Sequence, residues 1–519
     1  MVFSSNIFLF LFLPLTLFLY FILPEKLIGK KYKNYLLLIA SLIFYAWGEA
    51  QYLWLLLLSI VGNYFFGIAI GACKASFAKG GGQLQSNWSE DLNNISSELT
   101  LKNHPSQIPT VFDPPSFSKR AFLLVLALAF NLSLLAYFKY ANFLVENLNE
   151  LLALFSTYKI SLEKVHLPIG ISFFTFHSIS YLVDIYRKKC TPQKNILNLA
   201  LYISFFPQLI AGPIVRYNFI EKYLTNRRHN AFFVAYGIRR FLIGLGKKVI
   251  IANPLGELAD VIFSSQVGEL STTIAWVGIV CYSLQIYFDF SGYSDMAVGL
   301  AHIFGLKFPE NFNYPYISQS IKEFWRRWHM SLSAWFRDYV YIPLGGNRVS
   351  LSRQYFNLVL VFFLCGLWHG ASWNFVIWGL FHGFFLVFER VKIGEKFLNS
   401  LPKFIQHFYT IFIVMIGWVF FRSPDLPHAL NYLQAMLVPI ETNIVASEIM
   451  RLMDSHFVLM SLIFALIGMS PVVKNIALKM MRKNKNFIFI FDMFLILVLI
   501  AAIIRISAST HNPFIYFQF

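Results

Sequence analysis

The chain has 519 residues, of which 57% are hydrophobic, 18% are aromatic and only 13% are charged. A soluble globular domain carries about 25% charged residues, so the composition excludes an ordinary soluble protein and favours a polytopic membrane protein. The net charge of +17 would suggest nucleic acid as the partner of a soluble chain. Here the basic residues gather in loops between apolar segments, so we expect a membrane-lipid environment and no nucleic acid.

The apolar segments predict an all-α fold, a bundle of transmembrane helices. A bilayer is spanned by about 20 apolar residues, and the sequence predicts roughly 10–13 hydrophobic elements, some of them short, re-entrant or interfacial. They lie at 6–23, 34–47, 51–72, 120–141, 168–186, 195–212, 232–252, 271–290, 355–388 (two elements), 405–421, 456–471 and 487–506. Neither an internal repeat nor a second soluble domain is evident, so one membrane domain is expected over residues 1–519.

The basic loops predict the orientation of the chain. No Lys or Arg precedes the first apolar segment, which argues for an uncleaved first span with the N-terminus in the periplasm. The basic loops are expected in the cytoplasm. Binding of anionic lipid headgroups is a lesser alternative role for them. Their residues are Lys26, Lys30, Lys31, Lys33, Arg187, Lys188, Lys189, Arg227, Arg228, Lys474, Lys479, Arg482, Lys483 and Lys485.

Three segments are too polar to span a bilayer. Residues 74–118 contain GGG and many Ser, Asn and Pro residues, which is typical of a flexible loop, here expected in the cytoplasm. Residues 143–163 carry charges at loose helical spacing, which indicates an interfacial helix. Residues 308–351 are punctuated by Pro and Gly, and irregular backbone at membrane depth is tolerated only inside protein or beside a watery cavity. The third segment is therefore expected to line the entrance to a site.

Ionisable groups concentrate in two runs, KEFWRRWHMSLSAWFRDYVYIPLGGNR at 322–348 and CGLWHGASWNFVIWGLFHG at 365–383. Such groups at membrane depth are costly and usually mark a site or a pathway. His369 lies among small residues and tryptophans. The tryptophans desolvate the imidazole, which favours its neutral form, and a neutral imidazole can act as a general base. A lone membrane histidine would be structural. Beside the first run, we interpret His369 as catalytic.

His329 has three open roles: it could orient substrate, stabilise charge or assist His369. Arg326, Arg327 and Arg337 are permanently charged and suited to phosphate or carboxylate, with pairing to Glu323 and Asp338 as the structural alternative. His382 is given mainly a structural role.

The other polar groups of the sequence give weaker evidence for a functional site. The 4 cysteines form no CxxC pair, and no metal site is expected; Cys365, four residues before His369, is interpreted as a packing residue. Asp289 and Asp295 could bind a cation or serve a proton path, but capping and internal pairing, for instance with an arginine of the 326–337 cluster, is the preferred interpretation. No HExxH, GxSxG, Walker or dinucleotide motif occurs, which argues against a soluble hydrolase, an ATPase and a nucleotide-cofactor redox enzyme.

The runs FWRRWHMSLSAWFRDYVYIPLGGNR and GLWHGASWNFVIWG resemble the membrane-bound O-acyltransferase family, in particular its alginate and peptidoglycan O-acetyltransferase branch. LPIGISFFTFHSISYLVDIYR at 167–187, FFPQLIAGPIVRY at 205–217, FDFSGYSDMAVGLAHIFG at 288–305 and NPFIYFQF at the end agree with it. The resemblance implies helices around a central funnel or tunnel, with His369 as the invariant histidine of the GLWHG motif and His329 as that of the RRWH motif. Residues 74–118 depart from it.

The resemblance further implies transfer of an acetyl group from a cytoplasmic thioester to an envelope or secreted polysaccharide. Acetyl-CoA is the expected donor, with an acyl carrier as alternative; no bound cofactor is expected, and a periplasmic acetyltransferase is the expected partner protein. The tunnel residues expected to bind substrate are Trp325, Arg326, Arg327, Trp328, Arg337, Asp338, Tyr339, Asn347, Trp368 and Asn374. The implied location is the bacterial inner membrane. Open alternatives are D-alanyl transfer to a teichoic-acid-like acceptor, a transporter, and a scaffold for polysaccharide export.

Overall fold

The structure is a computed structural model that describes residues 2–22, 31–73, 118–227, 229–265, 270–439 and 447–508. Within these ranges all regular structure is helical, as the sequence predicts, and no strand is present. Nearly all of the predicted 74–118 loop, residues Lys26, Lys30 and Arg228 of the basic loops, and the C-terminal NPFIYFQF lie outside the described residues.

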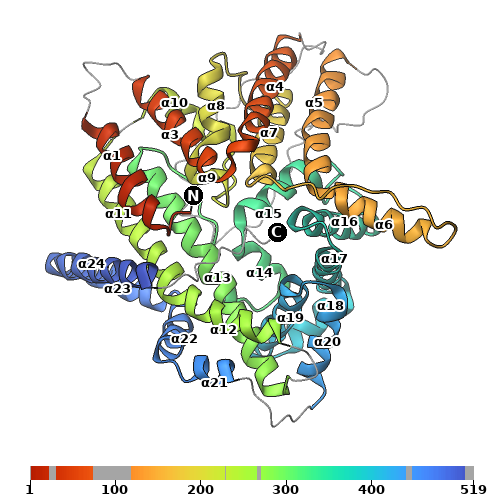
Figure 1. The fold of residues 1–519 in the computed structure, drawn as a ribbon, viewed down its shortest axis with the longest axis vertical. Coiled ribbons are helices and arrows are strands. Elements are labelled where there is room, and N and C mark those ends of the chain that lie inside the picture. The colour runs from red at the N-terminus through yellow and green to blue at the C-terminus, as the bar shows by residue number, and fades with distance from the viewer. Residues whose placement is uncertain are drawn as a thin grey trace.

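The first half of the chain supplies helices at the top, left and bottom of the view in Figure 1. Its helices, in chain order, are η1 (Phe8–Phe12), α1 (Leu13–Ile22), α3 (Tyr32–Glu49), η2 (Ala50–Tyr52), α4 (Leu53–Ala72), α5 (Lys119–Leu135), η3 (Ala136–Tyr140), α6 (Ala141–Leu152), α7 (Ile171–Tyr186), α8 (Ile196–Ser204), α9 (Phe206–Leu209), α10 (Tyr217–Thr225), α11 (Ala231–Gly246), η4 (Lys247–Ala252) and α12 (Asn253–Ser264).

The second half supplies helices in the centre, at the right and at the lower left of the same view. It comprises α13 (Thr272–Ile303), η6 (Pro315–Ile317), α14 (Ile321–Arg327), α15 (Met330–Phe336), η7 (Arg337–Tyr341), α16 (Leu351–His369), α17 (Trp373–Phe388), α18 (Lys392–Ser400), α19 (Lys403–Arg422), α20 (Leu426–Leu437), α21 (Ser447–Met453), α22 (His456–Gly468), α23 (Val472–Lys483) and α24 (Lys485–Ala508).

Six helical stretches of the described chain are long and apolar enough to cross a membrane, or seven if the bent pair α21–α22 forms one span. They are Tyr32–Ala72, Lys119–Leu152, Thr272–Ile303, Leu351–His369, Lys403–Arg422 and Asn486–Ala508. The expected elements at 168–186 and 195–212 are helical too, but their helices are shorter than a bilayer-spanning length. The expected element at 232–252 belongs to α11, η4 and α12, which continue without a break from Ala231 to Ser264 and are not among the six stretches. The helix predicted over 143–163 ends at Leu152, and α6 projects from the body of the protein (Figure 1).

Helix α13 forms the spine of the bundle and is buried along almost its whole length. It packs along α11 with backbone contact, since a Cβ added at Gly244 would lie 2.5 Å from the carbonyl oxygen of Gly292. Small residues allow such approach, which favours helix association inside a membrane. The apolar core therefore continues around α13 instead of being confined to one of its faces.

Helices α16 and α17 form an equally close hairpin. A Cβ added at Gly366 would lie 2.2 Å from the carbonyl oxygen of Phe375, and one at Gly379 would lie 2.3 Å from that of Phe362. The glycines of the second polar run thus let the two backbones touch. Since Gly366 is one turn before His369, this contact fixes where α16 ends.

The segment 308–351 folds as short helices between the longer ones, in agreement with the predicted lack of a span. The carboxylate of Glu389, at the end of α17, accepts hydrogen bonds from the backbone N–H groups of Ile321 (2.6 Å) and Lys322 (2.9 Å). A carboxylate at a helix N-terminus satisfies orphan donors and complements the helix dipole. Helix α14 is therefore anchored to the α16–α17 hairpin, and α14 and α15 lie near the middle of the bundle (Figure 1).

Candidate active site

A narrow cavity beside His369 marks the candidate site. It leaves only about 10 Å³ for the centre of a water-sized sphere and is lined by Ile286, Phe290, Trp328, His369, Trp378, Trp418 and Phe421. The side chains come from α13, the α14–α15 junction, α16, α17 and α19. The lining is apolar and aromatic except for the imidazole and the indole N–H groups. Such a pocket holds an uncharged group and excludes bulk water.

His369 is the last residue of α16 and is 6% exposed. Its ring packs edge-on against Trp378, at 5.0 Å between centroids, and against Phe421, at 5.1 Å. Edge-to-face packing by large aromatic rings holds a side chain in one orientation. Of the tryptophans near His369 in the sequence, Trp368 and Trp378 contact its ring, joined by Phe421 from α19, whereas Trp373 is exposed and donates to Asn147.

Two side chains of η3 hold the C-terminal end of α16. The Tyr140 hydroxyl donates to the carbonyl of Leu367 at 2.7 Å, and the Lys139 ammonium donates to the carbonyls of Trp368 and of His369, the latter at 3.2 Å. The last carbonyls of a helix have no partner within the helix, and a cation near them is favoured by the helix dipole. Lys139 and Tyr140 therefore fix the backbone from which the His369 imidazole projects.

His329 lies at the start of α15 with backbone angles φ 41° and ψ 55°, in the left-handed region. A non-glycine residue there costs about 1–3 kcal/mol and persists where the surroundings impose it, often at functional sites. The ring is 1% exposed and packs edge-on against Phe290 at 4.7 Å between centroids. Burial lowers the pKa of His329 to about 3, so the imidazole is neutral at physiological pH.

The fold brings the two motif histidines to the same indole. The centroid of the Trp368 ring lies 5.0 Å from that of His369 and 6.3 Å from that of His329. Trp368 is itself stacked on Phe176 of α7 at 5.2 Å. Two neutral, buried imidazoles on one aromatic platform beside an apolar cavity form an arrangement suited to proton transfer.

The three candidate arginines differ in their partners. Arg327 pairs with Glu323 at 2.8 Å, and Arg337 pairs with Asp338 at 2.6 Å. Arg326 is exposed, and no ion pair or hydrogen bond of its guanidinium is present among the described residues. Arg326 is therefore the member of the set whose charge is available to an anionic ligand.

Asp338 and Tyr339 belong to a separate polar cluster near the end of α7. Asp338 also pairs with Arg216 at 2.7 Å, and the Tyr339 hydroxyl donates to Asp184 at 2.9 Å. Burial raises the pKa of the Asp338 carboxyl, but the guanidinium groups of Arg337 and Arg216 outweigh it and hold the pKa below its usual range. These residues are paired with one another and do not line the cavity.

Other predicted residues take supporting positions. Asn347 accepts from Arg390 at 2.9 Å, and the Asn374 amide donates to the carbonyl of Ser423 at 2.7 Å. Trp325 packs edge-on against His382 at 5.1 Å, away from the cavity lining. Of the predicted substrate-binding residues, Trp328 lines the cavity, and the Trp368 ring packs beside the imidazoles of His329 and His369.

The remaining polar groups of the sequence have structural partners. Asp289 pairs with Lys248 at 2.7 Å, and Asp295 pairs with Arg240 at 2.7 Å and Lys247 at 2.8 Å, so both acids are paired, with cations from α11 and η4 instead of an arginine of the 326–337 cluster. Cys365 is buried one turn before His369. Among the described residues, no group of three or more His, Cys, Asp or Glu side chains is arranged to hold a metal ion.

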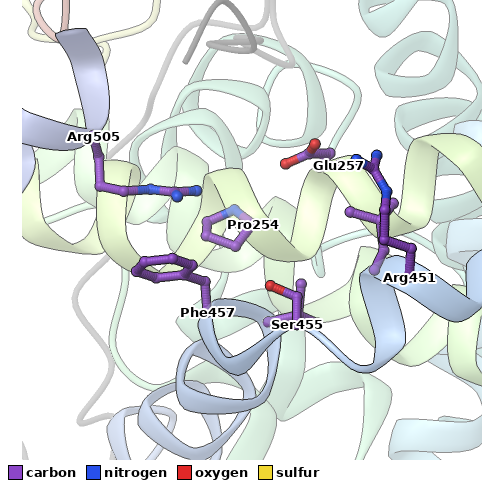
Figure 2. A pocket seen from close by; sticks show the side chains of 8 residues that line it. Pro254, Glu257, Arg451, Ser455, Phe457 and Arg505 are labelled. Carbon is purple, nitrogen blue, oxygen red and sulfur yellow. The ribbon is translucent and has the colours of Figure 1, made fainter. Parts of the chain in front are cut away.

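A larger pocket, of about 200 Å³ by the same measure, lies elsewhere, between α12, α21, α22 and α24. Figure 2 shows Arg505 over the ring of Phe457, at 4.5 Å from its centroid, and Glu257 beside Arg451. Neither motif histidine lines it. Because chemistry requires groups that transfer protons, the smaller cavity at His369 is the better candidate active site.

Several residues of the site escape sequence reasoning. Lys139 gave a usable signal, since a lysine inside the apolar segment 120–141 is costly unless it has a task. Phe421 and Trp418 gave none, because aromatic residues are abundant throughout the chain. Asn311, which bonds His329, lies in a polar stretch where one more amide carries no signal.

The fold and the site together define an integral membrane enzyme with a buried pair of histidines. A family model described as MBOAT, the membrane-bound O-acyltransferase family, matches residues 122–421. The chain belongs to this family, and it is a multi-pass membrane O-acyltransferase.

Curated relatives from several bacteria are similar over long stretches. The chain is 44% identical to the protein named "Probable alginate O-acetylase AlgI" of Pseudomonas aeruginosa, over 84% of this chain and 75% of that protein. It is 35% identical to a peptidoglycan O-acetyltransferase of Helicobacter pylori, over 100% and 98%. It is 33% identical to a teichoic acid D-alanyltransferase of Bacillus subtilis, over 50% and 70%.

Proposed function

We propose that this protein takes an acetyl group from a cytoplasmic thioester, with acetyl-CoA as the donor, and delivers it across the bacterial inner membrane for O-acetylation of an alginate-like exopolysaccharide or peptidoglycan. The observation that carries the proposal is the narrow apolar cavity with His369 in its wall, together with the Trp368 ring that lies beside both His369 and His329. The relatives named for alginate and peptidoglycan O-acetylation support the acceptor class.

The chemistry assigned to the site is one acyl transfer. His369 takes the proton of an acceptor hydroxyl, and the hydroxyl oxygen forms a bond to the thioester carbonyl carbon. The carbon–sulfur bond then breaks, and the leaving thiolate receives the proton from His369. General-base help of this kind contributes about 10²–10⁴-fold. The hydroxyl belongs to the glycan or to a Ser or Tyr of a periplasmic acetyltransferase partner.

Trp378 is the proposed donor to the developing oxyanion. It is 1% exposed and lines the cavity next to His369. Its indole nitrogen has no hydrogen-bond partner in the described part of the chain, whereas that of Trp418 donates to Tyr316 at 3.2 Å. An indole N–H can only donate, and a buried donor without a partner is costly unless a ligand completes it. The Asn374 amide is taken by Ser423, so it is less suited to this role.

Arg326 is the proposed contact for the phosphates of the donor. It lies one residue from Trp325 and three from His329, and its guanidinium is exposed. Arg327 has the same charge one residue away but is paired with Glu323. Replacing Arg326 should therefore weaken donor use more than replacing Arg327, which provides a matched control.

The deciding experiment offers purified protein in detergent labelled acetyl-CoA, with and without an oligosaccharide or partner acceptor. The expected result is label transfer or slow hydrolysis, lost in His369→Ala with normal expression and membrane insertion. Full activity of an inserted His369→Ala protein would overturn the catalytic assignment.

D-alanyl transfer to a teichoic-acid-like acceptor is the second candidate, favoured by the 33% identity to the D-alanyltransferase. It predicts inertness toward acetyl-CoA and transfer only from an acyl carrier. Mass analysis of cell-envelope glycans with and without this chain separates the two products.

A further inference from the structure

Asn311 is buried beside His329 and belongs to a non-helical stretch that makes backbone hydrogen bonds to the residues around the start of α15. It is 1% exposed, and its backbone carbonyl accepts from the N–H of Met330 at 2.9 Å. Two residues on, the N–H of Asn313 donates to the carbonyl of Arg327 at 2.9 Å. These two backbone bonds hold the Asn311 side chain in register with the strained His329.

The identity of the Asn311 atom that faces His329 follows from Ser331. The backbone N–H of Ser331 lies 3.2 Å from this atom, and a backbone N–H can only donate, so the atom is the amide oxygen Oδ1. The Ser331 hydroxyl reaches the same oxygen at 2.9 Å. Since that hydroxyl accepts from the N–H of Ile214 at 3.0 Å, its own proton is directed to Oδ1.

The protonation of His329 follows in turn. Its Nδ1 lies 3.0 Å from Oδ1, and an oxygen that can only accept requires a proton on Nδ1. A neutral imidazole carries one proton, so Nε2 has the lone pair. Nε2 is buried and has no hydrogen-bond partner within the described residues.

We propose that Asn311 is a positioning residue that locks His329 in the tautomer with the proton on Nδ1, so that His329 enters the reaction as an acceptor through Nε2. Of the three roles open to His329, stabilising an oxyanion through Nε2 is thereby excluded, because that nitrogen has no proton to donate. The donor function falls to the indole of Trp378. The consequence for acyl transfer rests on the proposed function, whereas the tautomer itself does not.

The charges around His329 leave this tautomer undisturbed. His369 is the titratable group nearest to it on α16, and the two imidazoles interact electrostatically. On α13, Asp289 precedes the Phe290 that packs on His329, and it is paired with Lys248. On its own segment, Arg327 is paired and Arg326 is exposed. Burial dominates, so the neutral form persists.

The direct test is the nitrogen NMR spectrum of ¹⁵N-histidine-labelled protein in lipid, because protonated and lone-pair imidazole nitrogens resonate far apart. His329 is assigned by subtraction of the spectrum of His329→Gln. The expected result is a protonated Nδ1 and an unprotonated Nε2 at neutral pH. A protonated Nε2 would overturn the proposal, whatever the enzyme transfers, and absence of acetyl transfer would overturn the proposed function while leaving the tautomer standing.

A second test reads activity against pH. Asn311→Asp keeps an acceptor for Nδ1 and Ser331 but adds a negative charge, which favours the imidazolium. The acid limb of the kcat profile should move up by about one pH unit or more, with recovery at higher pH. Asn311→Leu should lower kcat at every pH without moving the limb. Asn313→Asp, an exposed position on the same stretch, should leave the profile unchanged.

An acid limb in Asn311→Asp that coincides with that of the unmodified protein, in folded protein of normal thermal stability, would show that Asn311 has only a packing role. If Asn311→Asp does not fold, the NMR spectrum of the unmodified protein decides alone.

Discussion

Lys139 of η3, which contacts the end of α16, allows the sharpest test of how the site is held in position. Lys139→Met removes the ammonium that donates to the carbonyls of Trp368 and His369 and keeps most of the apolar stem. Each buried carbonyl left without a partner costs about 1–3 kcal/mol. The variant no longer buries an ammonium, which offsets part of that cost. We therefore expect a net loss of about 1–3 kcal/mol of stability.

The effect on activity should exceed the effect on stability. The two carbonyls belong to the last turn of α16, and fraying of that turn moves His369 relative to the cavity. A displacement of about 1 Å at a catalytic group can cost about 10²-fold in rate. Tyr140→Phe removes one neutral hydrogen bond, to Leu367, and should cost about 1 kcal/mol and less activity.

The assay compares thermal unfolding in detergent with acetyl transfer by the same preparations. Lys159→Met, at an exposed position past α6, is the control for loss of a lysine and should change neither quantity. Lys139→Met with unchanged unfolding temperature and unchanged kcat would refute the idea that the η3 side chains position His369.

Four further outcomes are expected. Trp378→Phe should lower kcat by about 10²–10³-fold in steady-state assays, as loss of one oxyanion donor does elsewhere, whereas Trp418→Phe should have less effect; equal effects would remove the donor role. Arg326→Gln should raise KM for acetyl-CoA in a salt-dependent way, and Arg327→Gln should not; identical KM values for the two variants would count against the donor contact. The folded-state pKa of Asp338 lies below the usual 3.8, so its contribution to stability is complete above pH 3.8 and is lost as the pH falls through the folded-state pKa. Acid unfolding monitored by tryptophan fluorescence should therefore be less steep in Asp338→Asn. Cysteines placed in 26–33 and 474–485 should be protected from impermeant maleimide in intact cells, and labelling from outside would reverse the orientation.

Part of the site could be read from residue types alone. Ionisable side chains are costly in an apolar chain, so the runs at 322–348 and 365–383 indicated a functional site. The residue order of these runs carried the family resemblance. The same logic correctly denied a membrane span to 308–351, where the structure has only short helices. The all-α fold followed from the apolar composition, because backbone groups in lipid must be satisfied within helices or a closed barrel.

The number of spanning helices was harder to read, because hydropathy does not distinguish a buried short helix from a span. Helix α7 has an apolar sequence, but 14 of its 16 residues are buried in the core. Helix α13 shows the converse, since it contains two aspartates and is long enough to span. Its acids are tolerated because Lys248, Lys247 and Arg240 from neighbouring segments neutralise them. Such pairings join residues far apart in the chain.

The sequence by itself determined the class of fold, the family and the two histidines, because each of these is written in local composition or in a continuous motif. Tertiary structure alone decided which candidate arginine has no ion pair within the described part of the chain, that Lys139 holds the end of α16, and that the Asn311 oxygen faces Nδ1 of His329. Hydrogen bonds and ion pairs depend on a few ångströms between atoms brought together by folding. A linear pattern records which groups are present, and the packing of α13 to α17 settles which of them meet.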